Sequence, residues 1–204
     1  MQRNEFTNNL VLRHFDRARE ITNNTMFMFA IDAPDNDKDR SIPDSLRQAM
    51  HWPEHVKSVY DYKTMFPGVY ERLFQFCVIS LCSDIEIFFK ELFDVYGYSH
   101  QGRSFGFFQR VEDVFSALKA EGVELAPVAS SIQTVQLAFQ VRHIGVHNMG
   151  MVDESFHRKT GQGKVGNPFY IDQTIYRSMF DAYVAILEYL DGVLPIYVPD
   201  QISR

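Results

Sequence analysis

The chain has 204 residues, 46% of them apolar and 23% charged, a composition ordinary for a globular protein of one compact domain with an additional arm. Its apolar runs fall far short of the roughly 20 residues that a membrane span needs. The N-terminus lacks the apolar core of a secretion signal, so we expect a cytoplasmic protein with no membrane partner. The formal net charge of −6 counts against a generic nucleic-acid binder, because such proteins are usually basic.

The first third of the chain is predicted to be helical and partly charged. Apolar residues at helical spacing predict a first helix over residues 5–30. A polar loop rich in turn-forming residues follows at 32–43, and short helices are expected over 44–51 and 53–64. We predict that residues 1–66 form an N-terminal helical arm with a charged loop, packed with the rest of the chain as one compact unit.

Residues 67–197 are predicted to form an antiparallel helical bundle. The helix expected over 67–97 is apolar on nearly every side in its first half, which is typical of the central helix of a bundle or of the seam of a dimer. Apolar stripes with glycine or proline at their ends predict the other helices, over 105–120, from 127 to about 146, within 149–161 and over 171–191. No pair of strands can be discerned, so the predicted fold class is all-α.

An arginine falls on the apolar stripe of the predicted helix that begins at 127. Arg142 follows Val135 by seven residues and Phe139 by three, so all three lie on one side of a continuous helix. An unpaired guanidinium in such a place is costly, and an acidic partner is therefore expected. Asp84 and Glu86, in the apolar helix over 67–97, are the two candidates.

A histidine close to this arginine suggests chemistry. His147 lies five residues after Arg142, and positions five apart on a straight helix diverge by about 140°. We therefore expect the helix to bend at Gly145 or to end at 148–150, which would turn Arg142, His147 and Asn148 toward one cleft. An imidazole can exchange protons with a ribose 2′-hydroxyl, and a guanidinium can hold the phosphate. RNA supplies its own nucleophile, so this chemistry needs no metal and no cofactor.

The segment after Arg142 is locally basic. It carries His143, Arg158 and Lys159, which are candidates for binding an anionic substrate such as RNA.

The run from Arg142 to Thr160 resembles the HEPN superfamily, whose signature is an arginine, four to six residues and a histidine. The His-Asn-x-Gly-x-Val-Asp continuation, the basic-Thr-Gly end, the glycine-rich loop and the final amphipathic helix follow the layout of its RNA-processing, stress-response branch (RiboL-PSP-HEPN-like). The resemblance covers about residues 67–192. It implies a helical bundle that forms a homodimer and joins two Arg–His motifs in one cleft. It also implies a metal-independent endoribonuclease of toxin–antitoxin or phage-defence systems, with a cognate antitoxin or regulatory protein as a partner.

The resemblance also implies roles for single residues. Arg142 corresponds to the phosphate stabiliser and His147 to the general acid and base, with Asn148 beside them in the catalytic group. Glu86 resembles the acidic residue that orients the arginine, and Asp84 competes for that role. The chain departs from the family at His143, where asparagine or aspartate is frequent. Some members of the family are inactive and serve as binding domains.

Three other interpretations remain open at the level of sequence. His143 and His147, four residues apart, could bind a metal together with Asp153, Glu154 or His157. The same cleft could bind a nucleotide or a partner protein without catalysis. The arginine and histidines could also be polar groups of a bundle with no further role.

Overall fold

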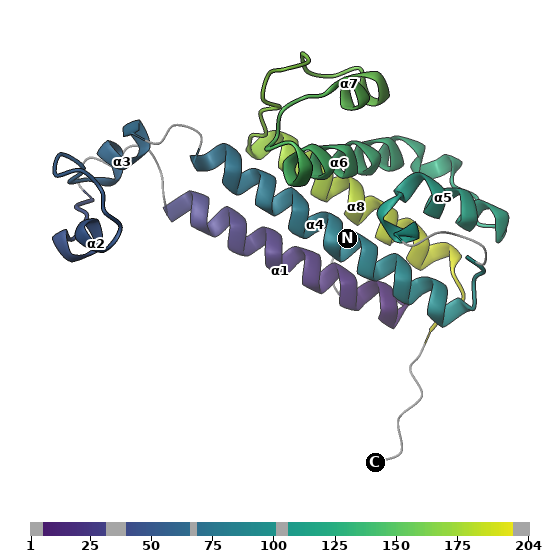
Figure 1. Cartoon of the computed structure of the whole chain (residues 1–204). Coiled ribbons are helices and arrows are strands. Elements are labelled where there is room, and N and C mark those ends of the chain that lie inside the picture. Colours follow the sequence, from purple (N-terminus) through teal and green to yellow (C-terminus); the bar gives the residue numbers. More distant parts are fainter. Residues whose placement is uncertain (1–5, 32–39, 66–68, 101–105, 198–204) are drawn as a thin grey trace.

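The computed structural model of the chain describes residues 6–31, 40–65, 69–100 and 106–197 (Figure 1). These residues contain no β-strand, and their only β-type pairing consists of isolated bridges from Ser41 to Ser58 and from Met151 to Pro168. None of the helices in these ranges has the length and apolar character to cross a bilayer. The prediction of an all-α fold is confirmed.

Four long helices form the bundle. In the described residues the α-helices follow one another as α1 (Asn9–Ile31), α2 (Asp44–Ala49), α3 (Val59–Met65), α4 (Val69–Tyr96), α5 (Val111–Ala120), α6 (Ala129–His147), α7 (Glu154–Thr160) and α8 (Gln173–Val193). Two 3-10 turns, η3 (Phe107–Gln109) and η4 (Ala126–Val128), precede α5 and α6. α4 and α8 each contact the other three long helices, so both lie at the centre of the bundle (Figure 1).

Aromatic side chains hold α4 in place. Phe88 has no exposed surface, and its ring lies 6.1 Å from that of Tyr183 on α8. Phe89 meets Phe115 of α5 edge-on, with 5.3 Å between the ring centroids. Edge-on pairs of this kind add to the apolar area that the rings bury. The high phenylalanine content of the sequence is therefore used largely in the core.

The described residues of the predicted arm, 6–31 and 40–65, form two parts. α1 lies along α4 and α8 with Leu10 buried between the helices (Figure 1). Asp191 of α8 accepts the backbone N–H groups of Thr7 and Asn8 at 2.9 and 2.7 Å, which fixes the start of α1. α2 and α3 project to one side of the bundle (Figure 1).

The helix predicted over 53–64 begins only at Val59, so the predicted start is wrong. Before Val59, the carboxylate of Asp61 accepts the backbone N–H groups of Lys57 and Ser58 at 3.0 and 2.9 Å. A side chain that satisfies these N–H groups from within the first turn fixes where the helix starts.

The helix predicted over 105–120 is interrupted in its first turns. Gly106 has a φ of +80°, and Arg110 lies outside the helical region at φ −103° and ψ 82°. The result is a 3-10 turn followed by α5, which begins at Val111. This turn brings Gln109 to a cavity that α6 also lines, as described below.

A buried carboxylate lies between α4 and α1. Asp84 is 3% exposed, and its Oδ1 accepts a hydrogen bond from Arg17 Nε at 2.7 Å, while half of the Arg17 side chain remains in solvent. Burial raises the pKa of Asp84, and the attraction of Arg17 opposes the rise without cancelling it. The folded protein therefore binds a proton at Asp84 more tightly than the unfolded chain does.

We expect Asp84→Asn to raise the free energy of unfolding at pH 7. With a raised folded pKa, the carboxyl contributes stability that is fully present below its unfolded pKa and is lost as the pH rises through the folded value. The amide of the Asp84→Asn variant has no such loss, because it does not ionise. Its cost is the missing ion pair with the half-exposed Arg17, worth about 0–1 kcal/mol. Urea denaturation at pH 7 and pH 4 measures the difference, which should shrink at pH 4. A variant less stable than the wild type at both values would contradict this.

Candidate functional site

Arg142 of α6 finds its acidic partner on α4. Its guanidinium donates a hydrogen bond from Nη1 to Oε1 of Glu86, and both side chains are only about one fifth exposed, at 21% and 19%. The competing candidate, Asp84, faces α1 and pairs with Arg17. Residues two apart on a helix point about 200° away from each other, so Asp84 and Glu86 cannot serve the same neighbour.

The other face of Arg142 opens into a small cavity of about 310 Å³, here named the Arg142–His147 cavity. Its lining comes from one turn before α5 and from the last two turns of α6, and comprises Gln109, Phe139, Arg142, His143, Val146 and His147. The imidazole rings of His143 and His147 lie 4.9 Å apart, tilted by 52°. Both rings belong to exposed residues. An anion entering from solvent would therefore meet a guanidinium and two imidazoles together.

Of the two expected alternatives, a bend at Gly145 and a helix end at 148–150, the bend is absent. α6 continues without interruption from Ala129 to His147 and ends at its C-cap residue, Asn148. Arg142 and His147 both line the cavity although they lie about 140° apart around the helix axis. His143, about 100° from Arg142, lies between them. The prediction that both line one cleft agrees with the geometry, whereas the predicted bend is wrong.

Asn148 lies at the end of α6, outside the lining of the Arg142–His147 cavity. Its side-chain amide donates to the backbone carbonyl of Met151 at 2.7 Å. The backbone N–H of Gly150, at φ +80°, donates to the carbonyl of Ile144 at 2.9 Å. Asn148 therefore holds the turn that ends the helix, and this geometry does not support the catalytic role given to it from the sequence.

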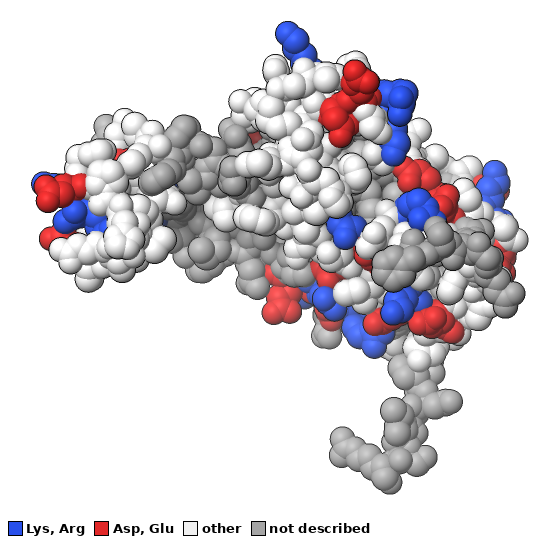
Figure 2. Space-filling model, viewed as in Figure 1, with Lys and Arg blue, Asp and Glu red and all other residues white. Residues whose placement is uncertain are grey.

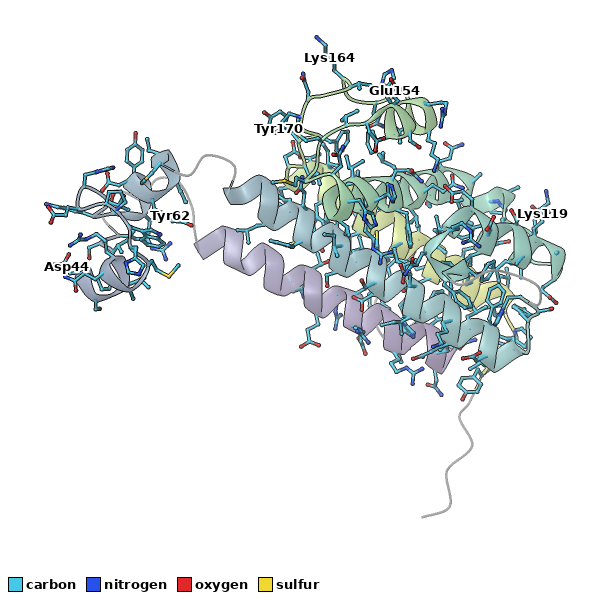
Figure 3. The ribbon with its side chains drawn as sticks, viewed as in Figure 1. Asp44, Tyr62, Lys119, Glu154, Lys164 and Tyr170 are labelled. Atoms are coloured by element: carbon cyan, nitrogen blue, oxygen red, sulfur yellow. The ribbon has the colours of Figure 1, made fainter. Side chains whose placement is uncertain are left out.

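The basic residues of α7 lie apart from the cavity. Asp153 caps the start of α7 by accepting the N–H of Phe156 at 2.7 Å. Figure 3 shows α7 and the following loop, where Glu154 and Lys164 are labelled, above α6, which α7 contacts. Arg158 and Lys159 are exposed there, and only Lys159 lines a described cavity, a second and larger one. These two residues can touch only a substrate that extends well beyond the Arg142–His147 cavity.

The residues of the alternative metal site do not come together. Asp153 is occupied as a helix cap, and His157 Nδ1 lies 2.9 Å from the carbonyl of Gly163. Across the part of the chain that the structure describes, no group of three or more His, Cys, Asp or Glu residues is suited to hold a metal ion. His143 and His147 are left as a pair beside a guanidinium, which would repel a cation.

Gln109 was not identified from the sequence. It lines the Arg142–His147 cavity and also a neighbouring hollow of about 250 Å³, whose walls include Glu86 and Lys90. Gln109 reaches α6 because the 3-10 turn after Gly106 folds back against α4 and α5. A residue placed by such a turn carries no periodic signal in the sequence.

The charged side chains on the face of the molecule in Figure 2 are mixed in sign. Lys and Arg side chains are interspersed there with Asp and Glu, without a continuous basic band. The chain matches no family model, and no match was found among curated proteins or solved structures. What supports a function is therefore the chemistry of the side chains: a guanidinium oriented by a carboxylate, with two imidazoles open to solvent beside it.

Two glycines near the site should respond in opposite ways to alanine. A Cβ at Gly145 would lie 3.8 Å from Ile79 Cδ1, an ordinary contact, so Gly145→Ala should stabilise the helix by up to about 1 kcal/mol. At Gly150 the φ of +80° costs an alanine about 1–2 kcal/mol, and its Cβ would also lie 1.8 Å from Gln75 Nε2.

Thermal and urea unfolding of the two variants measures these effects. Gly150→Ala combined with Gln75→Ala should recover the part of the loss that comes from the clash and none of the part that comes from φ. If Gly145→Ala destabilised the protein as much as Gly150→Ala does, α6 would not pass Gly145 as a regular helix.

Proposed function

We propose that this protein is a metal-independent endoribonuclease that cleaves RNA by transesterification in the Arg142–His147 cavity. The observation that carries the proposal is the Arg142–Glu86 pair, which holds a guanidinium beside the exposed imidazoles of His143 and His147. The resemblance of the run from Arg142 to Thr160 to the HEPN superfamily supports the same activity.

The proposed reaction uses the substrate's own nucleophile. His147 accepts the proton of the ribose 2′-hydroxyl as the 2′-oxygen bonds to phosphorus. Arg142 stabilises the charge that develops on the phosphate oxygens. The bond from phosphorus to the 5′-oxygen breaks, and that oxygen takes a proton from an imidazolium of the cavity. The products are a 2′,3′-cyclic phosphate and a free 5′-hydroxyl.

Glu86 acts through Arg142 in this scheme. A guanidinium has five N–H donors in a planar fork, and Glu86 accepts from Nη1. The remaining donors are available to phosphate oxygens, which match the fork in geometry. His143 contacts the same phosphate from the adjacent turn of α6, as its place in the cavity lining allows.

Exposed apolar residues next to the cavity support a homodimer. Phe76 of α4 is 65% exposed, and Val146 of α6 and Met149 just after it are 53% and 73% exposed. They belong to the same end of the bundle, because Gly150 faces Gln75 there. Large exposed apolar side chains grouped together are typical of interaction surfaces. A dimer through this face would bring two Arg142–His147 cavities close together.

The biological setting follows from the resemblance. We propose that the ribonuclease acts in the cytoplasm in a toxin–antitoxin, phage-defence or stress response. A cognate antitoxin or regulatory protein would then restrain it, because uncontrolled cleavage of cellular RNA is harmful to the cell.

A second candidate function is a catalytically inactive module that binds a nucleotide or a protein in the same cavity. The net charge of −6 and the interspersed charges on the face in Figure 2 favour it over an enzyme that binds long RNA tightly. The two candidates share the fold and the cavity, and only cleavage separates them.

We expect purified protein to cleave a mixed-sequence RNA in excess EDTA, leaving 2′,3′-cyclic phosphate ends. His147→Ala should lower the rate at least about 100-fold, because it removes the general acid and base. Glu86→Gln should lower it less, since the guanidinium remains but is held by a neutral partner. Denaturing gels and mass spectrometry of the products measure both effects.

His55→Ala is the matched control, since His55 is an exposed histidine of the segment between α2 and α3. It should cleave like the wild type. If the wild type, free of contaminating nucleases, cuts no RNA at any concentration, the enzyme proposal fails and the binding module takes its place.

We expect the protein to be a dimer in solution and Phe76→Glu to make it a monomer, because a carboxylate would be buried in an apolar interface. Light scattering after size-exclusion chromatography measures the mass. Leu46→Glu, at a similarly exposed leucine of α2, is the control and should remain dimeric. A wild type that is monomeric at micromolar concentrations would exclude this interface.

A further inference from the structure

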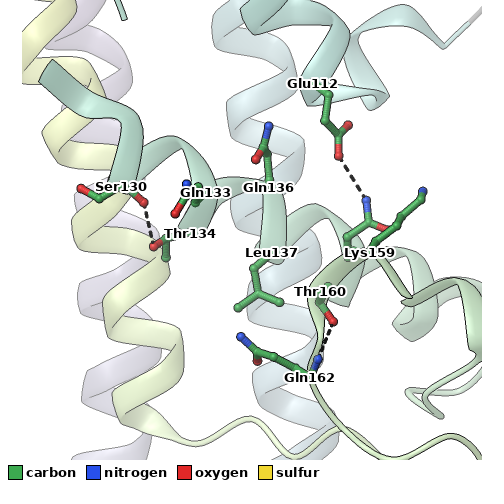
Figure 4. Close-up of a pocket in the computed structure, with 10 residues that line it drawn as sticks. Glu112, Ser130, Gln133, Thr134, Gln136, Leu137, Lys159, Thr160 and Gln162 are labelled. Carbon is green, nitrogen blue, oxygen red and sulfur yellow. Dashed lines mark hydrogen bonds between the residues drawn. The ribbon is translucent and has the colours of Figure 1, made fainter. Parts of the chain in front are cut away.

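A larger groove lies on the same helix as the Arg142–His147 cavity. It has a volume of about 880 Å³ and runs between α6, the end of α7 and the loop that follows (Figure 4). Four glutamines line it: Gln133, Gln136 and Gln140 from α6, and Gln162 from the loop. Figure 4 shows Gln162 extending from its loop toward α6. We name this feature the glutamine groove.

The two threonine hydroxyl groups of the glutamine groove already donate hydrogen bonds within the protein. Thr134 and Thr160 donate to backbone carbonyls of their own helices at 3.2 and 2.8 Å. By contrast, the side-chain amides of Gln133, Gln136 and Gln162 form no hydrogen bond with any other described residue. Each amide offers a donor and an acceptor, so the groove presents unused pairs of both kinds to a ligand.

The glutamine groove and the Arg142–His147 cavity follow one another along α6. Gln136, Gln140, His143 and His147 follow one another at intervals of four, three and four residues, so they form one stripe along α6. At 1.5 Å per residue the stripe is about 16 Å long, which is the length of about five stacked nucleotides at about 3.4 Å each. A strand that places its phosphate at Arg142 would therefore run along the glutamines.

We infer that the glutamine groove binds the bases of single-stranded RNA next to the bond that is cleaved, and that it sets the sequence preference of the enzyme. The inference rests on the proposed ribonuclease function. Side-chain amides form paired hydrogen bonds with base edges, whereas neutral amides have little attraction for phosphate. Bases are accessible to such contacts in single strands, because a duplex of RNA buries their edges in a deep, narrow groove.

Two charged residues lie at the rim of the glutamine groove. Lys159 lines the groove from α7 and can hold the RNA backbone on the outer side. Glu112 of α5 lies at the same end of the groove (Figure 4), where it accepts a hydrogen bond from Gln140 at 3.4 Å. Lys159 therefore offers a phosphate a contact beside a carboxylate, so the amides of α6, and not the charge of the rim, are the main candidates for holding the RNA.

Binding to RNA of two lengths tests the inference apart from catalysis. The protein is the His147→Ala variant of the full chain, in EDTA, and the probes are fluorescently labelled single-stranded RNAs of twelve nucleotides with mixed sequence and of two nucleotides. Adding Gln136→Leu and Gln140→Leu should weaken binding of the twelve-nucleotide RNA at least tenfold and that of the dinucleotide less than twofold. Gln162→Leu changes the other wall of the groove. It should likewise weaken binding of the twelve-nucleotide RNA and leave binding of the dinucleotide unchanged.

Gln48→Leu, an exposed glutamine of α2, is the matched control and should change neither affinity. Circular dichroism and unfolding temperature confirm that each variant is folded. With otherwise wild-type protein, the two glutamine substitutions should raise KM for the longer RNA, leave dinucleotide cleavage unchanged and alter the preferred cleavage sequence.

The outcomes separate this inference from the proposed function. If the wild type cleaves RNA and the glutamine variants bind and cleave the longer RNA as the wild type does, the groove does not hold RNA although the enzyme proposal stands. If nothing is cleaved but the longer RNA binds and the glutamine variants lose it, the groove is an RNA site in a protein that is not a nuclease. If the longer RNA does not bind at all, the inference is wrong.

Discussion

The ion pair between Arg142 and Glu86 is the interaction on which the site depends. A guanidinium four-fifths buried between two helices needs an anionic partner, since a lone charge in that position would cost far more than the pair does. The pair joins α4 to α6 and fixes the orientation of the guanidinium fork. Arg142 also lines the cavity to which the two imidazoles of His143 and His147 belong.

Because α6 is a regular helix, the side chains near the Arg142–Glu86 pair form one continuous surface along its length. α6 passes Gly145 as a regular helix, so its side chains keep their helical register up to His147. One stripe then carries glutamines over its middle and histidines over its last two turns, with Arg142 beside them. In the proposed function, the groups that would bind a base and the groups that would act on the phosphate therefore lie on one helix. A helix holds such groups in place better than a loop does.

The sequence predicted the fold class and most helix positions, because apolar stripes report directly on which faces are buried. It also limited the partner of Arg142 to two carboxylates. It could not choose between them, because that choice depends on whether α1 or α6 lies on each side of α4. The bend at Gly145 was inferred from an idealised angle that ignores the width of a cavity and the length of the side chains lining it. Gln109 and the glutamine groove depend on a 3-10 turn and on the position of α7, neither of which leaves a periodic pattern.

In the proposed reaction the 2′-hydroxyl of the substrate is the nucleophile, and the Arg142–His147 cavity activates it. An RNA with one preferred cleavage site, compared with the same RNA carrying a single 2′-deoxynucleotide on the 5′ side of that bond, tests this proposal. We expect the wild type to cleave the first RNA in EDTA, with a 2′,3′-cyclic phosphate detected by mass spectrometry, and to leave the substituted bond intact. Cleavage of the deoxy-substituted bond, or products that end in a 3′-hydroxyl, would contradict it.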